Sequence, residues 1–181
     1  VSYQTATKLA EHKRRLQVMS TRDGMTGVYN RRHWETMLRN EFDNCRRHNR
    51  DATLLIIDID HFKSINDTWG HDVGDEAIVA LTRQLQITLR GSDVIGRFGG
   101  DEFAVIMSGT PAESAITAML RVREGLNTLR LPNTPQVTLR ISVGAAPLNP
   151  QMSHYREWLK SADLALYKAK KAGRNRTEVA A

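Results

Sequence analysis

Cysteine, long apolar runs and aromatic side chains are all scarce in this chain of 181 residues. Because Cys45 has no second cysteine to pair with, an intrachain disulfide is excluded and a reducing compartment, the cytoplasm, is expected. No apolar stretch approaches the ~20 residues of a membrane span, and the longest candidate, TLLIIDID, is interrupted by Asp58. We therefore expect no membrane contact from this segment.

An initiating methionine is also missing, since the chain begins at Val1. This start predicts that the chain is part of a longer protein, and a sensor or a membrane anchor is one possibility for its other parts. The length suits one domain with a proper core and a short appendage. The sequence contains no internal repeat and no low-complexity segment.

Basic residues outnumber acidic ones, and the formal net charge is +6. They crowd into three segments, EHKRR, NRRHWETMLRNEFDNCRRHNR and KAKKAGRNR. Solvated helix faces account for most of this charge, and the alternative is contact with the phosphates of nucleotides, nucleic acid or a membrane surface. A nucleic-acid interface needs aromatic side chains interleaved with the basic ones, so their lack here argues against a nucleic-acid partner.

The first residues, 1–22, are polar, lack proline, and place Leu9 and Leu16 seven positions apart, as on one seam of a helix. This pattern predicts a linker helix, with coiled-coil pairing as one possibility. Asp23, Gly24 and Gly27 then break the pattern. We place the boundary of the main domain there, so that it spans residues 23–181.

Apolar periodicity within the main domain predicts helices and strands that alternate. The helices are expected at residues 30–47, 76–90, 112–130 and 155–173, the last one ending at Gly173. The strands are expected at residues 54–57, 93–98, 103–107 and 136–146, with the middle two closing a hairpin around Gly99 and Gly100. The fold class is therefore α/β or α+β, with a central sheet flanked by helices.

Two carboxylates mark the ends of predicted strands. Asp58 ends a strand that reads as buried on both faces, where an ionised group needs a compensating partner. Asp101 lies in the hairpin turn, and the intervening helix is long enough to return the chain to a neighbouring strand, so the two can meet. Converging carboxylates suit Mg²⁺ and phosphoryl transfer. The GGDEF segment taken alone is more simply explained as a solvated acidic turn.

The polar segment after Asp58 also offers nucleotide contacts. Asn66 and Asp75 suit a guanine edge, because a buried carboxylate can accept from the base's N1–H and 2-amino groups, although a turn residue and a helix-start residue explain them equally well. His71 has no second histidine or cysteine at metal-ligand spacing and reads as a loop residue. Lys170 and Arg174 are either a phosphate clamp or ordinary partners of a helix C-terminus.

Together these motifs resemble the GGDEF family of diguanylate cyclases, which is named after the pentapeptide at 99–103. DGMTGVYNRR is similar to the family's opening motif, DIDHFKSINDTWGHDVGDEAI to its D-x-D-x-F-K and G-H-x-x-G-D stretch, and ADLALYKAKKAGRNR to its closing motif. Met25 and Val28 stand where the family usually has leucine, which exchanges one apolar side chain for another.

The resemblance implies a palm-like nucleotide-cyclase fold that joins two GTP into cyclic di-GMP and releases two pyrophosphates. It implies an Mg²⁺ cofactor, or Mn²⁺, held by Asp58, Asp101 and the Ile59 carbonyl. Catalytic roles carry over to Asp101, Glu102 and Lys63. Nucleotide contacts carry over to Phe62, Lys63, Asn66, His71, Asp75, Gly99, Gly100, Lys170 and Arg174. Here the glycines let the backbone lie close to the nucleotide.

The resemblance also implies a two-fold homodimer, because one bound GTP cannot supply both reactants. RGSD precedes GGDEF at the spacing of the family's product-inhibition site, which would place Arg90 and Asp93 on cyclic di-GMP, with Arg121 as the second arginine. A basic helix end followed by a turn aspartate is the plain alternative. For the whole chain, the main rival function is a catalytically inactive receptor of GTP or cyclic di-GMP.

Overall fold

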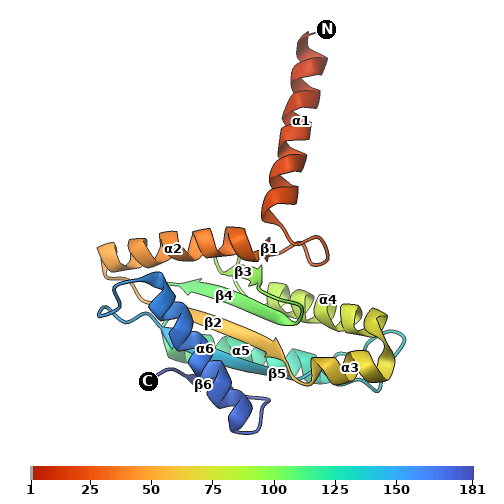
Figure 1. Cartoon of the computed structure of the whole chain (residues 1–181), viewed down its shortest axis with the longest axis vertical. Helices are drawn as coiled ribbons and strands as arrows, with labels where there is room; N and C mark the ends of the chain where they lie inside the picture. Colours follow the sequence, from red (N-terminus) through yellow and green to blue (C-terminus); the bar gives the residue numbers. More distant parts are fainter. Residues whose placement is uncertain (1) are drawn as a thin grey trace.

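A computed structural model describes residues 2–181 as a mixed sheet flanked by helices (Figure 1). In chain order the elements are α1 (Ser2–Thr21), β1 (Tyr29–Asn30), α2 (Arg31–His48), β2 (Ala52–Ile59), α3 (Phe62–Trp69), α4 (His71–Thr88), β3 (Val94–Arg97), β4 (Glu102–Ser108), α5 (Ala112–Thr128), β5 (Ile141–Pro147), α6 (Tyr155–Lys171) and β6 (Thr177–Val179).

The strands form one six-stranded sheet in the order β1-β3-β4-β2-β5-β6. Strand β2 lies in the middle and pairs antiparallel with β4 and with β5. The hairpin of β3 and β4 is confirmed, with Arg97 opposite Phe103. In the register of β2 and β4, Asp58 stands opposite Glu102. Glu102, which belongs to the signature pentapeptide at residues 99–103, therefore lies beside the end of β2, the middle strand of the sheet.

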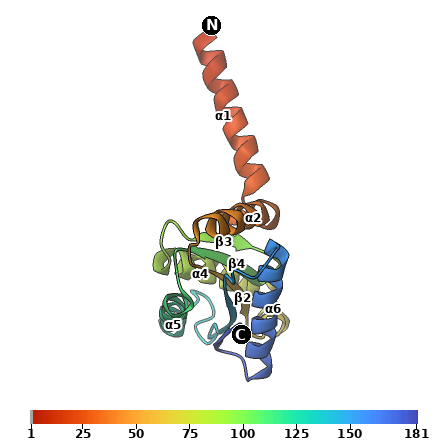
Figure 2. The same cartoon turned by 90° about the vertical axis from the view of Figure 1, so that its left-hand side faces the viewer.

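Helices cover both faces of the sheet (Figure 2). Leu55 and Ile57 of β2 belong to the core formed with α4 and α5, while Leu54 and Ile56 belong to the core formed with α2 and α6. Each of these four side chains is fully buried. The predicted burial of this strand on both faces is confirmed, and alternation along the strand explains why it reads as a continuous apolar run.

The contact between α6 and the sheet depends on a glycine. A Cβ at Gly144 of β5 would collide with the backbone of Ala162 and Leu166 in α6. Because no side chain stands between them, α6 lies directly against β5 and its C-terminal end reaches the end of β2. This close packing brings a basic helix end to an acidic strand end.

Several predicted boundaries were wrong. The segment 62–69, expected to be loop, forms α3, and α4 begins at His71 instead of residue 76, so His71 is a helical residue. Residues 136–140 are not strand, although Val137 and Leu139 are buried there. The apolar pattern of this segment predicts that its side chains are buried. A buried segment need not pair with a neighbouring strand, and residues 136–140 do not. Strands β1 and β6 are too short to be read from periodicity.

Helix α1 projects away from the rest of the chain (Figures 1 and 2). Its seam residues Leu9 and Leu16 are 68% and 54% exposed. Across residues 2–181, no helix combines the length and the apolar character needed to cross a lipid bilayer. The coiled-coil pairing of α1 and the domain boundary at residue 23 stay predictions.

Candidate active site

A cavity of about 540 Å³ opens where β2 ends and α3 begins. The cavity also reaches the C-terminal end of α6 and the turn between β3 and β4, residues 98–101, which we call the signature turn. It brings together seven of the residues predicted from sequence, which are Asp58, Ile59, Phe62, Lys63, Asp101, Lys170 and Arg174. These residues come from four different parts of the chain, so the cavity is assembled by the sheet topology.

Asp58 has the compensating partner that its position requires. Its side chain is buried, and one oxygen, Oδ2, forms an ion pair with the Nζ of Lys170 from α6. Its other oxygen, Oδ1, is buried and has no hydrogen-bond partner within residues 2–181. A buried acceptor without a donor is costly unless a further cationic or donor group reaches it.

Asp101 lies close enough to Asp58 for the two carboxyl groups to interact. Burial, together with the neighbouring Asp58, raises the pKa of Asp101 to about 7. The prediction that the two acids meet is therefore confirmed. Two crowded carboxylates and an orphaned oxygen suit a hard divalent cation, which would favour the ionised form of both.

The donor set is an open one. In the part of the chain that the structure describes, no cluster of three or more acidic, histidine or cysteine side chains forms a closed metal cage. Magnesium usually takes one or two carboxylates and leaves its other positions to water and substrate phosphates. Asp58, Asp101 and the backbone of Ile59 thus fit Mg²⁺, which would share its ligands with a nucleotide.

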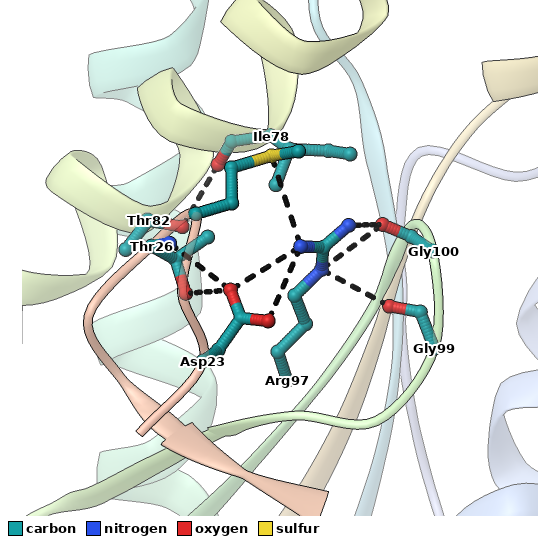
Figure 3. Close-up of polar contacts among 8 residues, drawn as sticks. Asp23, Thr26, Ile78, Thr82, Arg97, Gly99 and Gly100 are labelled. Carbon is teal, nitrogen blue, oxygen red and sulfur yellow. Dashed lines mark hydrogen bonds and ion pairs between the residues drawn. The ribbon is translucent and has the colours of Figure 1, made fainter. Parts of the chain in front are cut away.

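The signature turn is held by Arg97, which sequence reasoning missed (Figure 3). Its guanidinium donates to the carbonyls of Gly99 at 3.2 Å and Gly100 at 2.8 Å. It also forms an ion pair with Asp23 at 3.2 Å. Thr26 donates to the same carboxylate at 2.7 Å. Burial alone would raise the pKa of Asp23, but these hydrogen bonds from Thr26 and Arg97 lower it.

The two signature glycines are exposed. A Cβ at Gly100 would meet no other atom of the described chain within 4 Å, and one at Gly99 would meet only Glu102, at 3.8 Å. Packing within residues 2–181 therefore does not require glycine at either position. The role of these glycines beside a nucleotide therefore stays a prediction of the family resemblance.

Glu102 lies beside the cavity and does not line it. Burial, followed by the charges of Asp163 and Asp58, raises the pKa of Glu102. The second signature carboxylate is thus part of the same acidic cluster, at the position opposite Asp58 in the sheet.

The predicted base contacts are only partly assembled. Asn66 of α3 is half-buried, and its Oδ1 is buried and unpartnered within the described residues. Gly74 of α4 approaches this side chain so closely that a Cβ there would collide with it. Asp75 and His71 are both exposed and do not line the cavity of Asp58. The expectation of a buried Asp75 was wrong.

Asp75 instead borders a separate cavity of about 480 Å³ between α4 and residues 129–132. An exposed carboxylate discriminates less between guanine and adenine than a buried one, since water can satisfy it when the base cannot.

Arg90, Asp93 and Arg121 all line a further cavity, of about 350 Å³. The backbone N–H of Arg90 donates to Asp93 Oδ2 at 2.9 Å, and its guanidinium donates to Thr110 Oγ1 at 2.7 Å. Asp93 is 8% exposed, and its Oδ1 has no partner in the chain from residue 2 onward. Burial raises the pKa of Asp93. Arg121 was predicted only from its position on the next helix, and it lies in the same cavity as Arg90 and Asp93.

Residues 20–176 match the protein family described as "Diguanylate cyclase, GGDEF domain". The chain is 99% identical over 181 residues to the probable diguanylate cyclase DgcC of Escherichia coli strain K12, covering 100% of this chain and 49% of DgcC. It is 36% identical over 159 residues to the diguanylate cyclase DosC of the same strain, covering 87% of this chain and 34% of DosC. The chain thus spans about half the length of DgcC and a smaller part of DosC.

A solved structure has the same fold. The coiled coil and GGDEF domain of DgcB from Caulobacter crescentus, in complex with c-di-GMP, matches with a TM-score of 0.92 at 29% identity. The match covers 99% of this chain and 95% of that one, and therefore includes the projecting helix α1. The palm-like arrangement expected from the sequence is thus confirmed.

Proposed function

Because the chain belongs to the GGDEF family of diguanylate cyclases, we propose that it joins two GTP molecules into cyclic di-GMP and releases two pyrophosphates. One observation carries the proposal. Asp58, Asp101 and the pair Lys170 and Arg174 come from three distant segments of the sequence and converge on one cavity. Two acidic and two basic side chains suit a metal-bound triphosphate, because the carboxylates supply ligands for the cation and the basic groups supply countercharges for the phosphates.

Asp58, Asp101 and the Ile59 carbonyl would hold Mg²⁺ or Mn²⁺. The bound cation supplies positive charge that polarises the α-phosphate and favours deprotonation of the attacking hydroxyl. Lys63, Lys170 and Arg174 neutralise the phosphates that depart as pyrophosphate. Asn66 contacts the guanine through its unpartnered oxygen. Asp75 contacts the guanine together with Asn66 only if the bound base covers the exposed carboxylate of Asp75.

The reaction requires two subunits. Each 3′-hydroxyl attacks the α-phosphorus of the other GTP, forming an ester bond and breaking the bond between the α- and β-phosphates. A two-fold dimer that faces its two half-sites toward each other aligns both attacks. Pairing of α1 would bring two such domains together.

The cavity of Arg90, Asp93 and Arg121 is a candidate site for product inhibition. Two guanidiniums suit the phosphates of a guanine dinucleotide, and the unpartnered Asp93 oxygen suits the guanine donors. Because this cavity shares no lining residue with that of Asp58, bound product would act at a distance.

Incubation with GTP and Mg²⁺, followed by chromatography of the products, tests the proposal. We expect cyclic di-GMP, and we expect Asp58→Asn to lower the rate 10²-fold or more, roughly the usual cost of losing such a group. Asp67→Asn is the matched control, because Asp67 is an exposed carboxylate on the same cavity. Binding of GTP without any product would favour the receptor alternative.

The same assay with added cyclic di-GMP tests the second cavity. Product should slow the wild-type protein, while Arg90→Ala should keep its initial rate and lose the inhibition. Identical progress curves for the two proteins would remove the inhibitory role of Arg90.

A further inference from the structure

The turn after α6 has a backbone conformation that needs outside support. Its φ angles are +117° at Gly173, +64° at Arg174 and +49° at Asn175. Residues other than glycine rarely adopt such values, and they persist only where the surroundings hold them. The middle residue of this turn, Arg174, lines the cavity of Asp58. The position of a proposed phosphate contact therefore depends on what holds the turn.

Asp60 holds the turn from the end of β2. Its carboxylate is 8% exposed. Its Oδ2 accepts the backbone N–H of Asn175 at 2.8 Å, and its Oδ1 accepts the hydroxyl of Ser142 at 2.5 Å. Asp60 also donates its own backbone N–H to the Arg140 carbonyl at 2.8 Å. Because both carboxylate oxygens are occupied, the side chain cannot rotate away from the turn without losing a bond.

Other hydrogen bonds also hold the turn. The N–H of Arg174 donates to the Ala169 carbonyl of α6 at 3.0 Å, and the N–H of Val143 in β5 donates to the Arg176 carbonyl at 2.9 Å. The Arg176 guanidinium donates to the Arg174 carbonyl at 3.1 Å. The contact of Asp60 ties the Asn175 backbone to the residue that follows β2. The guanidinium of Arg123 lies near Asp60, since burial lowers the pKa of Arg123 while the charge of Asp60 raises it.

We propose that Asp60 is a positioning residue that fixes the strained turn 173–175 and so aims Arg174 at the phosphates of the nucleotide. The inference rests on the proposed function, in which Arg174 binds phosphate. The two aspartates Asp58 and Asp60 then have different roles. Asp58 faces Lys170 and the cavity, whereas Asp60 faces the backbone of the turn and Ser142.

Binding of 3′-deoxy-GTP in the presence of Mg²⁺ tests this without turnover, because this nucleotide lacks the attacking hydroxyl. Calorimetry would compare the wild-type chain, Asp60→Asn, Arg174→Ala and the double variant. We expect Asp60→Asn to weaken binding about tenfold, which is typical for a lost bond to a charged group. In the Arg174→Ala background, the same change should alter binding less than about twofold. Equal losses in both backgrounds would overturn the proposal.

Guanosine, measured as a competitor of 3′-deoxy-GTP, separates positioning from general damage. Its affinity should stay within about twofold in Asp60→Asn, since it has no phosphate to meet Arg174. Ser142→Ala is the matched control, because it removes the other bond of the same carboxylate and leaves that of Asn175. An equal loss of nucleotide affinity in Ser142→Ala would contradict a role exerted through the turn.

Gly173→Ala displaces the turn without touching Asp60, because alanine is strained at a φ of +117°. It should show the same selective loss of 3′-deoxy-GTP, and it keeps the proposal testable if Asp60→Asn does not fold. Unchanged binding in a folded Gly173→Ala variant would overturn the proposal. Absence of cyclic product together with the expected binding cycle would instead refute the proposed function and leave this inference standing.

Discussion

At the scale of single residues, Asp101 makes folding depend on pH. Burial and the neighbouring Asp58 raise its pKa from 3.8 to about 7. Between these values the folded protein holds a proton that the unfolded chain has released. The stability from this group is therefore fully present below about pH 4 and is lost as pH rises through about 7.

Urea unfolding of the metal-free protein between about pH 5 and about pH 8, a window that spans the raised pKa of about 7, measures this dependence. We expect the free energy of unfolding to fall with rising pH in the wild-type chain, and to fall less in Asp101→Asn. Asp67→Asn, at an exposed position on the same cavity, should keep the wild-type slope. Parallel curves for wild type and Asp101→Asn would contradict the raised pKa. Added Mg²⁺ should stabilise most strongly at high pH, where both acids are ionised.

Residue types and their local setting were enough to predict Asp58 and Asp101, because strand ends and hairpin glycines are read over a few positions. Asp60 and Arg97 were missed, since each acts through a contact remote in sequence. Arg97 meets Asp23, which is 74 positions away, and Asp60 meets Asn175, which is 115 away. Nothing local distinguishes such side chains from surface charges until the sheet order is known.

At the scale of elements, Arg97 connects the segment after α1 to the turn before β4 (Figure 3). We expect Arg97→Ala to fold and to lower kcat about 10- to 100-fold, since the turn that carries Asp101 loses charged hydrogen bonds to two carbonyls. Steady-state rates at saturating GTP measure the kcat of Arg97→Ala and of the wild-type chain.

Arg22→Ala is the control for Arg97→Ala. Arg22 also contacts the segment after α1, through the Gly27 carbonyl and the ring of Tyr29, but has no hydrogen bond to the signature turn. It should keep kcat within about twofold. A wild-type kcat in Arg97→Ala would show that the turn keeps its shape without this arginine.

The elements of the sheet were predictable where the apolar pattern was strong, as in the continuous apolar run of β2 and in the hairpin strand β4. The corner formed by α3 and α4 was not, because Gly74 packs against Asn66 through a contact that only the absence of a side chain allows. Residue spacing did not predict the exposed position of Asp75 on α4 either, even though its place in the motif was clear.

At the scale of the whole molecule, residues 2–181 provide one cavity that brings Asp58 and Asp101 together with Lys170 and Arg174. The proposed reaction consumes two nucleotides together, so it needs two such cavities. Helix α1 stands apart from the sheet (Figure 1). Its residues Leu9 and Leu16 are exposed. Exposed leucines seven positions apart suit pairing with the same seam of a second copy, which would bury both. Activity should then follow the fraction of chains that are paired.

Specific activity should therefore rise as the protein concentration rises, until pairing is complete. Replacing both Leu9 and Leu16 by glutamate should shift this rise to at least about tenfold higher concentration, because like charges at the seam oppose pairing. Val18→Glu is the matched control, since Val18 is also an exposed apolar residue of α1, at 51%, but points away from that seam. Product formation measured over a dilution series decides the matter. If the double variant follows the wild-type curve, α1 does not bring the half-sites together, and the dimer must form through the catalytic domains themselves.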